Sequence, residues 1–187
     1  MSLIEVVVFI VILGIAIVGT LVLYNRVTEA SVDPMVRKQA LALASSMLEE
    51  VELRAFTFCD PDEPAVYTAT AGCGSAPAHV EVLGPESFSP PGTEDRYSST
   101  APFDNVNDYN NFRMGAGQAN PDIKTADGTI ITSLASYSVV VSVANAGGDF
   151  GFAADEVLLI TVTATHAPTS IAVTLQGYRF RYAPNSP

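Results

Sequence analysis

The chain has 187 residues, of which 48% are hydrophobic and 16% charged, and its formal net charge is −11. An acidic surface repels phosphates, so this charge disfavours nucleic-acid binding through a broad basic patch and tight adhesion to anionic lipid. The low charged fraction and the high apolar fraction argue against general disorder.

The N-terminus carries an uncharged, mostly apolar run from Val6 to Leu23, preceded by a single acid, Glu5. As a helix this run would be roughly 27 Å long, about the thickness of a bilayer's hydrocarbon core. A carboxylate is costly to bury there. We therefore expect Glu5 either at the headgroup level of a simple anchor, or beside a cationic partner where copies of the helix pack together.

The segment from Met1 to Val8, MSLIEVVV, resembles the N-terminus of a processed type IV pilin. The resemblance implies that a membrane peptidase removes a short basic leader and N-methylates Met1; an unprocessed start is the alternative. It also implies that Glu5 pairs with the N-terminal amine of a neighbouring subunit. Gly14 and Gly19 interrupt a helix that is expected to run to Thr28 or Ala30, and pilin helices commonly lose order in this region after assembly.

A second helix is predicted from Pro34 to about Phe56. Asp33 is a good N-cap and Pro34 suits a first helical turn, so a kink or a restart is expected at residues 31–34. Apolar residues then recur at helical spacing and should pack one face on a sheet: Ala40, Leu41, Ala44, Met47, Leu48, Val51 and Ala55.

The segment from Phe58 to about Asn120 is rich in Pro, Gly, Ser, Thr, Asp and Asn, which predicts irregular structure with one short strand at 79–83. Cys59 and Cys73 lie within it, and in an exported chain a disulfide is the first expectation. Two buried free thiols are the alternative. A metal site is less favoured, because no histidine lies at a ligand spacing from either cysteine.

Asp104, Asn107 and Asp108 form the densest group of oxygen-bearing side chains. With backbone carbonyls they could hold Ca²⁺, or they could simply make loop turns by bonding their own backbone. The remaining carboxylates are expected to be scattered over a solvated surface. Residues 103–112, together with 59–62 and 31–34, resemble the minor-pilin-like subunits of the mannose-sensitive haemagglutinin pilus group.

In the last third of the chain, side chains alternate in the manner of β-strands at 137–143, 158–162 and 171–175. The connections at 145–156 and 167–169 suit antiparallel hairpins. After Gly177 the large residues change phase, which predicts a bulge there or burial on both faces.

The predicted fold is α+β: a long N-terminal helix whose second half packs on a small antiparallel sheet. Its segments are a membrane or filament-core helix (1–30), an amphipathic helix (31–57), an irregular loop region with the disulfide (58–135) and the sheet (136–187). The sequence has no Gly-rich phosphate loop, no His/Cys ligand cluster and no nucleophile motif. A structural protein is therefore expected rather than an enzyme.

The resemblance implies a pilus subunit from a Gram-negative bacterium. It would enter the inner membrane, meet the prepilin peptidase, and be extracted by the pilus assembly machinery into a homopolymeric extracellular pilus used for adhesion or motility. Two alternatives keep the fold. One is a pseudopilin of a type II secretion system, and the other is a membrane-anchored periplasmic binding module that does not polymerise.

Overall fold

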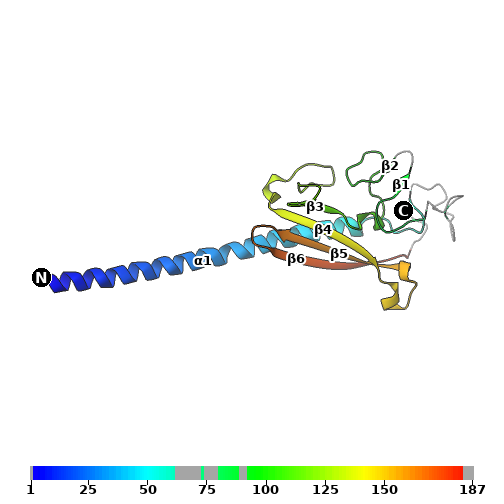
Figure 1. Cartoon of the computed structure of the whole chain (residues 1–187). Coiled ribbons are helices and arrows are strands. Elements are labelled where there is room, and N and C mark those ends of the chain that lie inside the picture. Colours follow the sequence, from blue (N-terminus) through cyan, green and yellow to red (C-terminus); the bar gives the residue numbers. More distant parts are fainter. Residues whose placement is uncertain (1, 62–72, 74–79, 89–91, 183–187) are drawn as a thin grey trace. The chain divides into compact units, whose positions relative to one another are not determined.

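A computed structural model of the chain describes residues 2–61, 73, 80–88 and 92–182, without the side chains of residues 25–33 (Figure 1). It divides into two compact units, Met1–Gln39 and Ala40–Pro187. The regular elements in chain order are α1 (Leu3–Glu52), β1 (Ser87–Phe88), β2 (Gly92–Thr93), η2 (Asn107–Tyr109), β3 (Arg113–Gly115), η3 (Thr132–Leu134), β4 (Tyr137–Asn145), η4 (Gly147–Phe150), η5 (Ala154–Glu156), β5 (Val157–His166) and β6 (Ile171–Phe180).

One helix takes the place of the two that were expected. α1 continues through Pro34, so the predicted restart at residues 31–34 is wrong. Proline removes one backbone hydrogen bond, and the helical turns on both sides outweigh that loss. The helix ends at Glu52, not near Phe56, and Ala55 pairs with Asn105 in a parallel bridge.

The four-stranded sheet is antiparallel, in the order β3-β4-β5-β6 (Figure 1). The three predicted strands and both hairpins are confirmed. Each strand is longer than the alternating stretch from which it was predicted. The presence of β3 corrects the prediction, because this strand lies in the segment expected to be irregular. Its three residues pair with β4, where Gly115 reaches Ser138; an element this short leaves no periodicity for sequence reasoning to detect.

The core of the Ala40–Pro187 unit lies where α1 meets the sheet. Four residues of α1 at helical spacing are almost fully buried: Ala40, Ala44, Met47 and Val51. Alternate residues of β4 and β5 are buried as the sequence predicts, among them Val139, Val141, Ile160 and Val162. Leu41, expected on the packed face, is instead 46% exposed.

β6 explains the change of phase at Gly177 without a bulge. Its pairing with β5 is unbroken, and Gly177 lies directly opposite Ile160. A Cβ at Gly177 would meet the ends of the Glu52 and Leu48 side chains of α1, which would have to move to make room for it. The large residues of this end, Tyr178 and Phe180, lie on the opposite, exposed face, where both rings contact Phe150.

Candidate functional site

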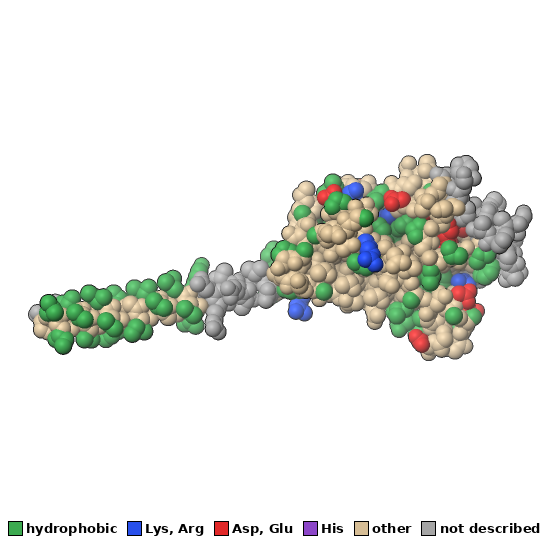
Figure 2. Space-filling view, in the orientation of Figure 1, with side chains coloured by type: hydrophobic (Ala, Val, Ile, Leu, Met, Phe, Trp, Pro, Cys, Tyr) green, Lys and Arg blue, Asp and Glu red, His purple; other side chains and the backbone are tan. Residues whose placement is uncertain are grey.

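The apolar end of α1 is the first candidate site. All described residues from Ser2 to Tyr24 are exposed, and Figure 2 shows apolar side chains over the visible face of this segment. By length and composition, Leu3–Tyr24 could cross a membrane, and a signal sequence would have the same character. Gly14 and Gly19 are helical, with open space around the position of a Cβ.

Glu5 has a local partner that the sequence reasoning missed. The Ser2 backbone N–H faces Glu5 Oε2 at 3.4 Å, and the Glu5 N–H faces Ser2 Oγ at the same distance. This reciprocal pair is a capping box, for which the signature is a serine followed three residues later by glutamate. Glu5 therefore helps to begin the helix, whatever else it does. Met1 lies outside the described residues.

The second candidate site is a group of six carboxylates, which we call the acidic cluster: Asp60, Glu81, Glu86, Glu94, Asp104 and Asp108. They fall into three overlapping trios, in each of which three carboxylate oxygens lie within 4.8 Å of one another. All but the half-buried Asp104 are buried. The expectation of carboxylates scattered over a solvated surface is therefore wrong for these six.

The members of the acidic cluster come from loops that are distant in the sequence. Glu86 and Glu94 flank the short β1–β2 hairpin, and the Glu94 N–H donates to the Glu86 carbonyl oxygen at 3.0 Å. Asp108 lies in η2, where its Oδ2 accepts hydrogen bonds from the N–H groups of Asp104 and Asn105 at 2.9 and 2.8 Å.

Only two of the three predicted oxygen ligands, Asp104 and Asp108, belong to the acidic cluster. Asp108 also makes the turn that was considered as the alternative, since one of its oxygens caps the backbone. The predicted calcium ligand Asn107 is buried too. Its backbone oxygen accepts from the N–H groups of Gly84 and Asn110, whereas its side-chain Oδ1 has no partner among the described residues. The sequence reasoning missed Asp60, Glu81, Glu86 and Glu94, for which no spacing rule exists because loop folding alone brings them together.

Burial sets the protonation chemistry of the acidic cluster. Burial, and next the charge of neighbouring carboxylates, raise the pKa values of Glu81 and Glu94 far above their usual range. Burial also raises the pKa of Asp108, against the lowering effect of the hydrogen bond from Asn105. The cluster is therefore costly to ionise without added positive charge.

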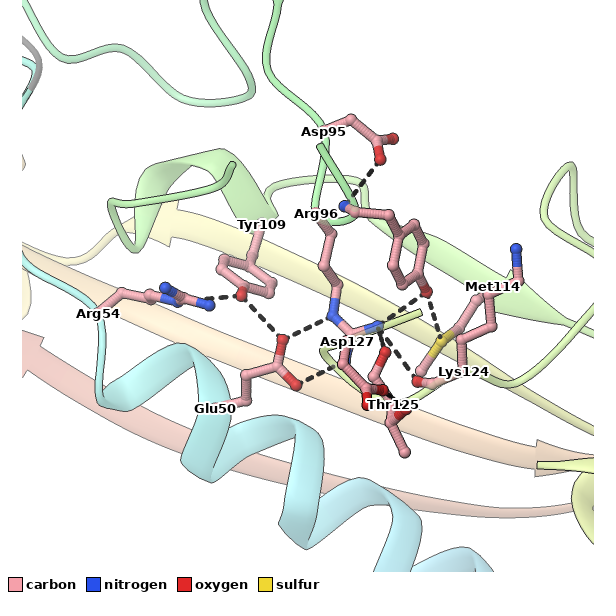
Figure 3. Close-up of polar contacts among 10 residues, drawn as sticks. Glu50, Arg54, Asp95, Arg96, Tyr109, Met114, Lys124, Thr125 and Asp127 are labelled. Atoms are coloured by element: carbon pink, nitrogen blue, oxygen red, sulfur yellow. Dashed lines mark hydrogen bonds and ion pairs between the residues drawn. The ribbon is translucent and has the colours of Figure 1, made fainter. Parts of the chain in front are cut away.

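A partly buried ion pair fixes the end of α1 to the loops of its unit, as Figure 3 shows. Both carboxylate oxygens of Glu50 accept from the Arg96 guanidinium, each at 2.6 Å. Tyr109 donates to Glu50 at 2.9 Å, and Arg54 donates to the Tyr109 oxygen at 3.2 Å. Arg96 also donates to the Tyr97 hydroxyl at 2.8 Å. We call these contacts the Glu50–Arg96 clamp.

The disulfide between Cys59 and Cys73 is present, as predicted, with the two Cα atoms 5.5 Å apart. Both cysteines are buried, and Phe58 and Val80 pack against the bridge. Val80 also pairs with Cys59 in a single antiparallel bridge, so the strand expected at 79–83 is reduced to this contact within the described residues. The bridge thus ties the segment after α1 to the chain that leads into the acidic cluster.

Comparison of the chain with protein-family models, with curated proteins and with solved structures finds no match. Function is therefore inferred from the residues of this chain.

Proposed function

We propose that this protein is a structural subunit of an extracellular filament of the type IV pilus kind, which assembles through its N-terminal helix. The observation that carries the proposal is the apolar helix Leu3–Tyr24, exposed along its whole described length, with Glu5 as its single charged residue. Such a surface requires either lipid or other apolar helices around it. Burial between helices would supply ~25 cal/mol per Å², before the entropy cost of association.

Glu5 has a distinct task in this proposal. Its carboxylate makes the helix a poorer membrane anchor and offers a partner to the N-terminal amine of a neighbouring subunit. Forming a buried ion pair adds little free energy, whereas leaving one charge unpaired costs about 3–5 kcal/mol. The pair therefore selects one packing register among many apolar alternatives. The subunit would pass through the inner membrane, be processed by a prepilin peptidase, and be extracted by pilus assembly machinery into a homopolymer for adhesion or motility.

Mass spectrometry of the N-terminus, combined with fractionation of the producing cells, tests the proposal. We expect N-methyl-methionine at Met1 and the protein in sheared extracellular fibres. Retention of the processed chain in the periplasm would favour a pseudopilin of a type II secretion system. An unprocessed chain that stays monomeric in detergent with a bound ligand would favour a membrane-anchored binding module.

A further inference from the structure

The acidic cluster places like charges where a fold would ordinarily avoid them. Glu86 and Glu94 flank β1 and β2, one residue beyond the pair Ser87 and Thr93, so they face each other across the base of the hairpin. Directly opposed like charges destabilise an antiparallel pair. Among the described residues, no Lys or Arg forms an ion pair with Glu81, Glu86, Glu94 or Asp108, whereas Glu50 pairs with Arg96 and Asp155 with Arg181.

Several of these carboxylates present an oxygen that nothing in the described structure satisfies. Glu86 is 6% exposed, and its Oε1 accepts from the Val82 N–H at 2.9 Å while its Oε2 has no partner. Asp108 is 1% exposed, and its Oδ1 has no partner while its Oδ2 is held by two backbone N–H groups. Glu81 is 9% exposed, with its Oε1 unpartnered. One oxygen orients Glu86 or Asp108, and the other remains free to bind.

The spacing of the carboxylates defines the centre. One trio combines Glu86, Glu94 and Asp108, with their ligand oxygens within 4.8 Å of one another. A second trio shares Glu86 and adds Asp60 and Glu81. Carboxylates at this separation can bind one cation from several sides, and a buried unpaired carboxylate otherwise costs several kcal/mol.

The donor atoms select the kind of cation. The acidic cluster consists of carboxylate oxygens, and the two cysteines of the chain are joined in the disulfide, so neither offers a thiolate. Hard oxygen ligands suit Ca²⁺ and Mg²⁺ rather than Zn²⁺ or Cu²⁺. Ca²⁺ accepts six to eight such ligands in a flexible cage, whereas Mg²⁺ keeps several of its waters, for which a buried cluster is poorly suited.

The disulfide indicates the compartment in which the protein works. Cys59 is adjacent to Asp60 in the chain, and a structural disulfide is typical of proteins outside the reducing cytosol. Extracellular calcium sites bind with dissociation constants of about 0.1–1 mM. The carboxylate ligands therefore suit Ca²⁺, and we expect binding in this range of concentrations.

We propose that Glu86, Glu94 and Asp108 bind a calcium ion, with Glu81 and Asp60 completing the centre through their contact with Glu86. The ion would join the β1–β2 hairpin, η2 and the segment after the disulfide through carboxylates that it allows to ionise together. This inference does not depend on filament assembly, because all five ligands belong to one chain.

The test uses the full chain, purified in a non-ionic detergent and stripped of divalent ions with EGTA. Equilibrium binding of ⁴⁵Ca²⁺ should give at least one ion per chain. Thermal unfolding, followed by near-ultraviolet circular dichroism, should shift upward by about 5 °C in about 5 mM Ca²⁺. Absence of bound ⁴⁵Ca²⁺ at millimolar concentration, or an equal shift with Mg²⁺, would overturn the proposal.

Variants separate metal binding from an ordinary structural role. Glu86→Gln and Asp108→Asn should weaken ⁴⁵Ca²⁺ binding at least tenfold, yet unfold in EGTA at a temperature no lower than the wild type, because each replacement keeps the size of the side chain and an acceptor oxygen for the backbone N–H groups. Asp149→Asn removes an exposed carboxylate outside the cluster and should keep the full calcium response. Unchanged calcium affinity in both cluster variants would rule out the assignment.

Discussion

Glu5 is the residue for which local and assembled roles must be separated. Its capping contact with Ser2 requires only a side-chain oxygen, whereas pairing with an amine requires a negative charge. Glutamine keeps the first property and removes the second. Comparing Glu5→Gln with Glu5→Ala therefore separates the capping role from the role of the charge.

We predict that Glu5→Ala and Glu5→Gln both block incorporation into fibres while leaving membrane insertion intact. Removing the carboxylate improves the helix as an anchor, by ~2 kcal/mol or more on insertion scales, and deletes the partner of the neighbouring amine. Fibre yield after shearing and the amount of membrane-bound subunit are the two measurements. Normal fibres from Glu5→Gln would show that Glu5 acts only as a helix cap.

Glu50 is the residue whose titration bears on stability. Burial alone would raise its pKa, but the hydrogen bond and charge of Arg96, and the hydrogen bond from Tyr109, outweigh burial and hold the pKa of Glu50 below its usual range. A carboxylate with a lowered pKa in the folded state stabilises the fold above its unfolded pKa. That stability is lost as the pH falls through the folded pKa.

We predict that Glu50→Gln lowers the free energy of unfolding by about 2–3 kcal/mol at pH 7. The cost is below that of a fully buried pair, because the Glu50 side chain is 19% exposed. The deficit should shrink as the pH falls below the unfolded pKa of glutamate, about 4.3, toward the lowered pKa of Glu50 in the folded state. Denaturant unfolding across pH measures both. Glu49→Gln, at the exposed neighbouring position, should change stability by less than about 0.5 kcal/mol, and a pH-independent deficit in Glu50→Gln would contradict the account.

At the scale of elements, the contact between α1 and β6 depends on a residue without a side chain. Strand propensity favours valine over glycine, so Gly177→Val should stabilise β6 if the strand alone mattered. Because α1 is so close, we predict the opposite: a loss of about 1–3 kcal/mol from overpacking against Leu48 and Glu52. Denaturant unfolding measures the change. Gln176→Val, on the exposed face of the same strand, should stay within about 0.5 kcal/mol of the wild type.

The stretch from Gly14 to Gly19 is helical in the isolated chain, and lipid would keep it so because it offers the backbone no other partner. In an assembled fibre, neighbouring chains and occasional water can satisfy those groups. We predict that the stretch is extended or poorly helical there, with helix resuming by about Tyr24. A fibre structure with unbroken helical hydrogen bonds from Ser2 through Tyr24 would refute this prediction. It would instead assign both glycines to close helix packing.

At the scale of the whole molecule, the disulfide joins Cys59 to Cys73, which is 14 positions further along the chain. The chain-entropy model gives ~3 kcal/mol for a loop of about 15 residues. We therefore predict that replacing both Cys59 and Cys73 with serine lowers the free energy of unfolding by about that amount. Denaturant unfolding under oxidising conditions measures the loss. Adding a reductant should lower the stability of the wild type but leave the double variant unchanged. An equal effect of the reductant on both proteins would show that the loss does not come from the disulfide.

The sequence by itself determined those features in which near neighbours in the chain decide the outcome. Periodicity identified the second half of α1 and the hairpins of β4, β5 and β6, because alternation and helical spacing record which face is buried. It did not show that α1 continues through Pro34. Composition identified the apolar helix as one that could cross a membrane. The cysteines permitted a single pairing within the chain, which the structure contains.

Only the tertiary structure decided what depends on contacts between distant residues. The closeness of the Leu48 and Glu52 side chains of α1 to Gly177 is a contact that no local pattern records. The clamp joins Glu50 to Arg96, and the acidic cluster gathers side chains between Asp60 and Asp108 from loops without periodicity. In such loops the backbone path is set by the packing of the whole unit, so neither the burial of a carboxylate nor its neighbours can be derived from local sequence.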